Sequence, residues 1–299
     1  MSVPVTLGLF GVNMGVCARP GAAPRVAALA ERLGYDSLWV ADHLVVPRPW
    51  APPSPMAPDY PILDPVVALT ALAQHTSRIQ LATGIVVLPQ RNPVVLAKQL
   101  ASVDVLSEGR LTFGMGVGYL EPELRAVGVP LEERGARSVE YLQAMRSLWS
   151  DEEPAFSGRF VSFEGVDAHP RPAQRPVPVV MGGHSRAAHR RAVRYADGWY
   201  GFMLDREATG EQVASLRREA EAAGRDPDEL ALTVSPSEQL DPAIVAEYAA
   251  LGIDRLALLP PPAFFRRGIE LGELEAFVEA SAPDQLGARR RADAPTPET

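Results

Sequence analysis

The sequence predicts an α/β protein in which eight parallel strands, each followed by a helix, close into a (β/α)8 TIM-like barrel. Short apolar runs alternate with amphipathic helical stretches along the 299 residues, and such alternation is typical of parallel sheets. About eight of these units fit into roughly 280 residues, which suits a closed barrel. No linker rich in Pro, Gly or Ser divides the alternation. A doubly wound open sheet is the competing architecture.

The elements follow from local patterns. Strand candidates are short β-branched and aliphatic runs at residues 5–10, 37–40, 79–88, 111–117, 177–181, 198–202, 230–234 and 255–259. Helix candidates span residues 22–33, 131–149, 186–195, 211–223, 242–251 and 272–280. Two more helices begin at Asp64-Pro65 and Asn92-Pro93, where Asp or Asn serves as N-cap and Pro takes the first helical position.

Three segments depart from this alternation. Residues 155–163 are predicted to form a small hairpin that turns at Ser157-Gly158, an insertion after the fourth strand–helix unit. Residues 47–61 hold seven prolines together with Trp50 and Tyr60, which indicates either a pocket wall over one end of the barrel or a solvent-facing spacer. Residues 282–299 are mostly Ala, Arg, Asp and Pro, so a frayed tail is expected after a single domain of residues 1–281.

The composition excludes several classes of protein. Apolar residues make up 46% and charged residues 22%, which is typical of a globular chain. A net charge of −8 argues against nucleic acid or an anionic membrane as partner. Cys17 is the only cysteine, so an intramolecular disulfide is impossible and a thiolate zinc site is not expected. No apolar run reaches the length of a membrane span and no basic leader is present, which predicts a cytoplasmic protein.

Unusual residues gather where strands of the predicted barrel end, the edge at which such barrels bind ligands. They are Asp42, His43, Thr83, Gly84, Ile85, Gly114, Gly116, Gly118, Tyr119, Gly182, Gly183, His184 and Ser185. Glycine at a strand end indicates a bulge, a tight turn or the close approach of a ligand to the backbone. Because several such places fall at one end of the barrel, we expect a flat ligand there.

The segment from Gly182 to Ser185 predicts a phosphate site. A Gly-Gly turn that opens a helix presents free N–H groups at the positive end of the helix dipole. Arg186, Arg190 and Arg191 follow on that helix. They either add positive charge to the site or form an ordinary solvated face.

His43 is the best candidate for acid–base chemistry, because an imidazole at a strand end can exchange a proton with substrate near neutral pH. The alternative is that His43 has only a structural role.

The sequence gives no support for several other kinds of functional site. The spacing of Gly114, Gly116 and Gly118 differs from a dinucleotide fingerprint. Neither a P-loop nor a G-x-S-x-G elbow occurs, and no H-x-H pair follows the first strand, so no metal site is expected.

Several stretches, in this order, resemble the luciferase-like flavin-dependent oxidoreductases. They are AERLGYDSLWVADH (30–43), NPVVLAK (92–98), LSEGRL (106–111), GMGVG (114–118), PVVMGG (178–183) and DGW (197–199). Within that family the chain resembles most the branch that uses the deazaflavin coenzyme F420.

The resemblance implies a site as well as a fold. It implies a ring at the carboxyl ends of the strands, with His43 beside it and a bulge with a non-prolyl cis peptide at Gly84-Ile85 behind it. The phosphate would lie on residues 182–185, where His184 stands in place of a common Asn. The remaining residues implied to contact the cofactor are Asp42, Thr83, Gly116, Gly118 and Trp199.

The leading prediction is an oxidoreductase that transfers a hydride between F420 and a small organic substrate. One alternative is an FMN-dependent monooxygenase that uses O2 and reduced flavin from a separate reductase. Another, of a different class, is a non-catalytic ligand-binding barrel. A homodimer is expected if apolar helix faces stay exposed.

Overall fold

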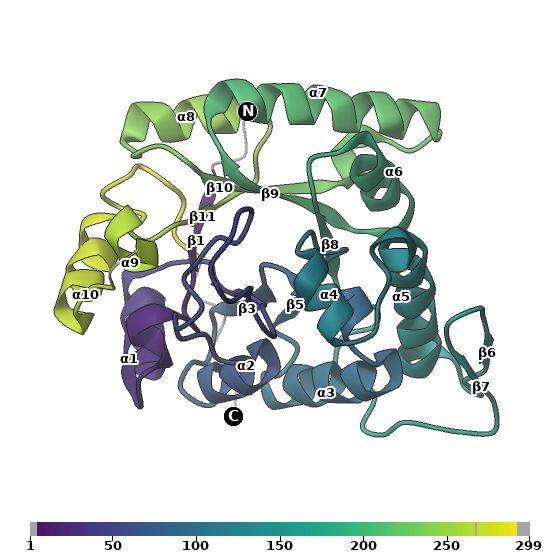
Figure 1. The fold of residues 1–299 in the computed structure, drawn as a ribbon. Helices are drawn as coiled ribbons and strands as arrows, with labels where there is room; N and C mark the ends of the chain where they lie inside the picture. Colours follow the sequence, from purple (N-terminus) through teal and green to yellow (C-terminus); the bar gives the residue numbers. More distant parts are fainter. Residues whose placement is uncertain (1–4, 267, 292–299) are drawn as a thin grey trace, which may run out of the picture.

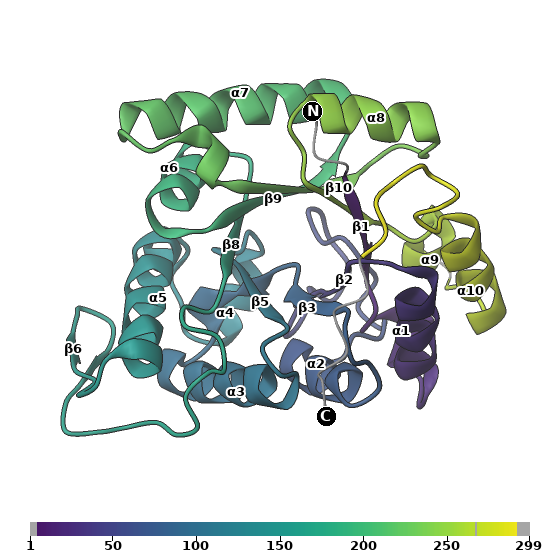
Figure 2. The same cartoon turned by 180° about the vertical axis from the view of Figure 1, so that it is seen from behind.

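The computed structural model describes residues 5–266 and 268–291. Within them, eight parallel strands close into a barrel surrounded by helices, which confirms the predicted (β/α)8 architecture (Figures 1 and 2). The barrel strands are β1 (Thr6–Phe10), β2 (Ser37–Val40), β3 (Gln80–Thr83), β5 (Leu111–Gly116), β8 (Val179–Gly182), β9 (Gly198–Leu204), β10 (Ala231–Pro236) and β11 (Arg255–Leu258). Pairing of Leu81 with Leu111 joins β3 to β5 and closes the ring. The open sheet is thereby excluded.

The helices lie on the outside of the barrel. They are α1 (Ala22–Leu33), α2 (Pro65–Ala73), α3 (Pro93–Leu106), α4 (Glu121–Ala126), α5 (Arg134–Ser150), α6 (Arg186–Tyr195), α7 (Arg206–Ala222), α8 (Pro242–Ala250), α9 (Pro262–Arg266) and α10 (Leu271–Ala280). Asp64 and Asn92 cap α2 and α3 as predicted, each accepting two backbone N–H groups. The hairpin of β6 (Phe156–Ser157) and β7 (Ser162–Phe163) follows α5, also as predicted.

Three of the predicted elements differ clearly in their bounds, and two short helices were not predicted. The expected strand at 79–88 is interrupted at Gly84-Ile85 and continues as a separate short strand, β4 (Val86–Val87). The helix expected from residue 211 begins at Arg206, because Asp205 caps it by accepting the Ala208 N–H. The helix expected from residue 131 begins with a 3-10 turn, Leu131–Glu133. The short helices α4 and α9 had no periodic signal of their own.

The prediction of a frayed tail from residue 282 is wrong for residues 282–291. Ala282 and Leu286 are buried against the barrel. Arg289 pairs with Thr6 beside β1, and the Arg291 guanidinium lies 3.4 Å from an oxygen of Asp36. Residues 282–291 are therefore part of the folded structure, and residues 292–299 lie outside the described residues.

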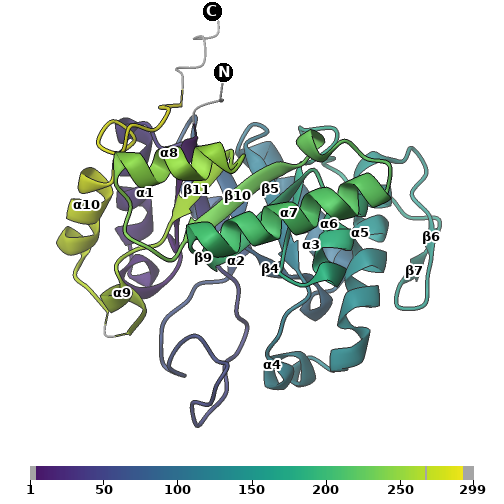
Figure 3. The same cartoon turned by 90° about the horizontal axis from the view of Figure 1, so that it is seen from above.

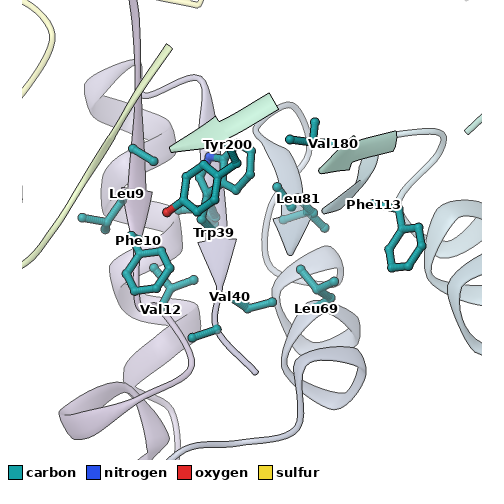
Figure 4. Packing of buried hydrophobic residues seen from close by; sticks show 14 of the residues in the cluster. Leu9, Phe10, Val12, Trp39, Val40, Leu69, Leu81, Phe113, Val180 and Tyr200 are labelled. Carbon is teal, nitrogen blue, oxygen red and sulfur yellow. The ribbon is translucent and has the colours of Figure 1, made fainter. Parts of the chain in front are cut away.

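Two stacked aromatic rings fill the inside of the barrel. Trp39 from β2 and Tyr200 from β9 lie parallel, with ring centroids 5.1 Å apart (Figure 4). Gly8 on β1 makes room for them, since a Cβ there would lie 2.7 Å from Trp39 Nε1. Phe113 faces the other way and meets Trp149 of α5 edge-on. Because the interior is packed, a ligand has to bind above it, at an end of the barrel.

The two ends of the barrel differ. The loop between β2 and α2 and the helix α4 project from the carboxyl ends of the strands (Figure 3). At the opposite end, Arg289 pairs with Thr6 at the start of β1. No helix within residues 5–266 and 268–291 is long and apolar enough to cross a membrane. The loop at 47–61 is anchored by Tyr60, whose hydroxyl donates to the Phe264 carbonyl at 2.7 Å.

The outer faces of α2 and α3 are apolar. Helix α2 carries no charged residue, and Val67, Val94 and Val95 are exposed on the two helices. The two charged residues of α3 do not interrupt this apolar face, because Asp104 is buried and Lys98 donates a hydrogen bond to the His169 carbonyl. Two copies of this chain can cover this face without burying an unpaired charge.

We expect the chain to dimerise through this face. The double variant Val67→Asp/Val95→Asp should then be a monomer at micromolar concentrations, where the wild type should be a dimer, because the contact would bury four carboxylates. Light scattering measures this directly. Val166→Asp, which changes an exposed valine elsewhere, is the control. A wild-type monomer at every concentration would contradict the expectation.

Candidate functional site

His43 leaves the end of β2 and is held by a buried carboxylate. Its Nδ1 lies 3.0 Å from Oε2 of Glu123, a residue of α4 whose side chain is 1% exposed. The other oxygen, Oε1, accepts the Leu44 N–H at 2.6 Å. A carboxylate can only accept hydrogen bonds, so it fixes the hydrogen on Nδ1 and leaves Nε2 as the free ring nitrogen. This carboxylate–imidazole pair can take up or release a proton at Nε2.

Tyr119 completes this side of the site. Its ring meets the His43 ring edge-on, with centroids 6.1 Å apart. Burial and the Glu123 carboxylate raise the pKa of Tyr119 to about 12, so its hydroxyl keeps its hydrogen at neutral pH. Of the aromatic residues Trp50, Tyr60 and Tyr119 that the sequence singles out, Tyr119 lies beside His43. Trp50 instead donates to the Ser54 carbonyl within its own loop, and Tyr60 anchors that loop to α9.

The side chain of Asp42 forms hydrogen bonds inside the protein and is not exposed at the site. It is buried, and its carboxylate accepts the Val87 N–H at 3.0 Å and an Arg91 N–H at 2.6 Å. Burial raises the pKa of Asp42, whereas Arg91 and the Val87 N–H oppose that rise. Arg91 also binds Asp64 at 2.7 Å. This network ties the end of β2 to β4 and to the start of α2, so Asp42 positions the neighbouring His43.

The segment Thr83-Gly84-Ile85 forms the bulge that the resemblance implied, with a cis peptide between Gly84 and Ile85. Thr83 is fully buried, and its hydroxyl donates to the Gly114 carbonyl and accepts the Gly114 N–H. Ile85 is partly exposed, and its side chain lies over Gly116 and Gly182. Ile85 therefore forms an apolar floor at the carboxyl ends of the strands.

Two glycines of this region make room for side chains of the protein. A Cβ on Gly116 would lie 2.3 Å from Cδ1 of Ile85, and one on Gly118 would lie 2.6 Å from Cγ1 of Val87. The absence of a side chain at these positions is therefore explained by the packing of Ile85 and Val87, and contact of either glycine with a cofactor stays a prediction. The side chain of Trp199 is fully buried. Its indole Nε1–H donates to the Gly183 carbonyl at 2.9 Å and so supports the turn above it.

The turn at the end of β8 presents unpaired backbone N–H groups. Gly183 has a φ of +124°, which only glycine adopts readily. Ser185 caps α6, its hydroxyl accepting the Ala188 N–H at 3.2 Å. The N–H groups of residues 184–187 have no acceptor among the described residues. Four free N–H groups at the positive end of a helix could hold an anion such as a phosphate.

His184 is part of this turn in a defined tautomer. Its Nε2 accepts the Phe202 N–H at 3.1 Å, so the hydrogen of the neutral ring is on Nδ1. Burial lowers the pKa of His184, which keeps the ring neutral at pH 7. His184 can therefore donate one neutral N–H near the phosphate site, as an Asn amide would.

Sequence reasoning missed two residues of this site. Glu123 is 80 residues away from His43 in the sequence, on a helix that has no amphipathic periodicity. The only sequence feature that could have indicated Glu123 is its position shortly after the glycine-rich strand β5. Met203 is 57% exposed with a φ of +55° at the bulge of β9. A positive φ costs a residue with a side chain about 1 kcal/mol or more, and nothing in the local sequence indicates it.

With this geometry established, comparison with known proteins identifies the family. The chain matches the luciferase-like monooxygenases over residues 5–250 and belongs to that family. An uncharacterized protein of Mycobacterium tuberculosis is 36% identical over 258 residues, which cover 83% of this chain and 88% of that protein.

Two further relatives differ in their cofactor. The F420-dependent glucose-6-phosphate dehydrogenase of Kineococcus radiotolerans is 32% identical over 72% of this chain and 63% of its own length. The FMNH2-dependent dimethylsulfone monooxygenase of Pseudomonas putida is 34% identical over 52% of this chain and 43% of its own length. The chain is thus an oxidoreductase of the luciferase-like type, whose relatives use either F420 or reduced FMN.

Solved structures agree on the fold. A monooxygenase from Streptomyces bottropensis superposes with a TM-score of 0.73 at 22% identity, over 94% of this chain and 98% of its own. An F420-dependent secondary alcohol dehydrogenase superposes with a TM-score of 0.74 at 18% identity, over 95% and 99% of the two chains.

The buried His189 on α6 gives this region a pH-dependent stability. Burial is the larger cause that lowers the pKa of His189 below its ordinary 6.5, and the nearby His184 lowers it further. The unfolded chain therefore binds more protons than the folded one at mildly acidic pH, so the free energy of unfolding should fall as pH decreases below about 6.5. Urea unfolding of the ligand-free protein between pH 7 and 5 measures this fall. His189→Asn should reduce the slope, whereas His75→Asn on the exposed end of α2 should leave it unchanged. An equal slope in His189→Asn would contradict the assignment.

Proposed function

We propose that this protein is an F420-dependent oxidoreductase that transfers a hydride between the deazaflavin and a small organic substrate. The observation that carries the proposal is the pairing of two unlike groups at the carboxyl ends of the strands. One is the Glu123–His43 pair, which can move a proton. The other is the row of free N–H groups at residues 184–187, which suits a phosphate.

The residues present fit a flat cofactor with a phosphate. Ile85 offers an apolar surface between the two groups, and Phe202 lies on the same end of the barrel, next to Phe10 at 5.2 Å between ring centroids. Residues 184–187 would hold the phosphate, and His43 would lie at the ring. The F420-dependent relative matches more of this chain than the FMNH2-dependent one does, which favours F420.

The chain's own groups would handle the proton that accompanies a hydride. When bound, the deazaflavin accepts or donates the hydride itself. His43 Nε2 takes the proton from a substrate hydroxyl, or returns it to a carbonyl oxygen. Glu123 stabilises the imidazolium that forms, and the Leu44 N–H keeps the carboxylate in place. The substrate is therefore an alcohol or carbonyl compound small enough to lie between Ile85 and His43.

The choice of cofactor can be measured by titration. We expect coenzyme F420 to bind at micromolar concentration, with FMN at least about tenfold weaker, as read from fluorescence quenching of each. Tight FMN binding with no affinity for F420 would reject the proposal. It would favour a monooxygenase fed with reduced flavin by a separate reductase, which oxygen consumption coupled to substrate would then support.

Kinetics test the role of the imidazole. His43→Ala should lower kcat by about 10²–10⁴ while leaving the affinity for the coenzyme within about threefold. Glu123→Gln keeps the size of the side chain but removes the charge that stabilises imidazolium, so kcat should fall in this variant as well. Glu121→Gln, on the exposed side of the same helix, is the matched control. Unchanged turnover in His43→Ala would remove His43 from the chemistry and favour a non-catalytic ligand-binding barrel.

A further inference from the structure

Three arginines lie together beside the phosphate site without any carboxylate partner. Arg134 is the first residue of α5, and Arg190 and Arg191 lie on the second turn of α6. None of the three has a carboxylate oxygen within 4.0 Å in the described part of the chain. The chain as a whole holds 37 acidic and 29 basic residues, so unpaired cations are not explained by a shortage of acids.

Geometry brings two of these arginines close to the start of α5. Nη1 of Arg191 lies 3.5 Å from the position that a Cβ on Gly135 would take, so this guanidinium reaches the start of α5. Helices α5 and α6 are neighbours in both views of the barrel (Figures 1 and 2). Arg134 donates to the Leu131 carbonyl through Nη1, while its Nε is buried without a partner among the described residues. We call Arg134 and Arg191 the arginine pair.

The neighbouring charges are engaged elsewhere. Glu133 binds Arg137 and Arg159 at 2.7 Å and 2.6 Å. Arg186, which the sequence placed with the phosphate site, pairs with Glu219 on the side of α7. Burial lowers the pKa of Arg191, and the charges of Arg134 and Arg190 lower it further. Half-buried like charges repel each other, and this cost is relieved when an anion binds among them.

We infer that the arginine pair binds the carboxylates of a γ-glutamyl tail attached to the phosphate of the coenzyme. Ser185 and Arg191 are six residues apart on or next to α6, or about 9 Å at 1.5 Å per residue. About three extended residues, at roughly 3.3–3.6 Å each, span this distance. FMN ends at its phosphate and offers no group to these two arginines. The inference therefore rests on the proposed function and gives it a residue-level basis for choosing F420.

Binding of two forms of the coenzyme tests this inference. One is the deazaflavin with its phospholactyl group but no glutamate, and the other carries two or more glutamates. The wild type should bind the glutamylated form about tenfold more tightly, since hydrogen bonds between charged groups are strong. This preference should shrink at high salt. Arg134→Gln/Arg191→Gln should lose the preference and keep its affinity for the glutamate-free form, which also shows that the variant is folded.

Arg194→Gln is the control, because Arg194 lies on the same helix over the Tyr195 ring and its loss removes an equal charge. Equal affinity of the wild type for both forms would overturn the role of the arginine pair and leave the proposed function intact. If Arg134→Gln/Arg191→Gln still prefers the glutamylated form, the inference is likewise overturned and the proposed function is unaffected. Failure of both deazaflavins to bind would overturn the proposed function and this inference together.

Discussion

The stack of Trp39 on Tyr200 is the contact on which the rest of this structure depends. It fills the barrel from inside and requires a small residue, Gly8, on the neighbouring strand. With the interior closed, Ile85 on the bulge after β3 becomes the floor of the site. The polar groups of the strand ends then surround an apolar surface, which is the arrangement a planar ring with a charged tail needs.

The site is divided electrostatically into two halves. On one side the buried Glu123 supplies a negative charge to His43, which suits a group that must carry a positive charge for part of a reaction. On the other side the N–H groups at the start of α6 and the guanidinium groups of Arg134 and Arg191 supply positive charge, and neither arginine has a carboxylate partner among the residues that the structure describes. Proton transfer and anion binding can therefore be altered separately by mutation.

The fold was largely predictable from the sequence because its signals are local. Caps such as Asp64 and Asn92 and the alternation of apolar runs act within a few residues. The break at Gly84 was not readable from the pattern, since it depends on the pairing of Thr83 with Gly114. The site was predicted less well. A sequence cannot show whether Gly116 leaves room for a ligand or for Ile85, or that Glu123 reaches back to His43.

The most direct test of this account is a crystal structure grown with coenzyme F420 in excess. The account predicts a phosphate within hydrogen-bonding distance of the N–H groups of residues 184–187, with the tricyclic ring against Ile85 and one edge toward Nε2 of His43. A coenzyme whose phosphate lies elsewhere, or a strand-end surface covered by the protein's own side chains with no space for a ring, would contradict it.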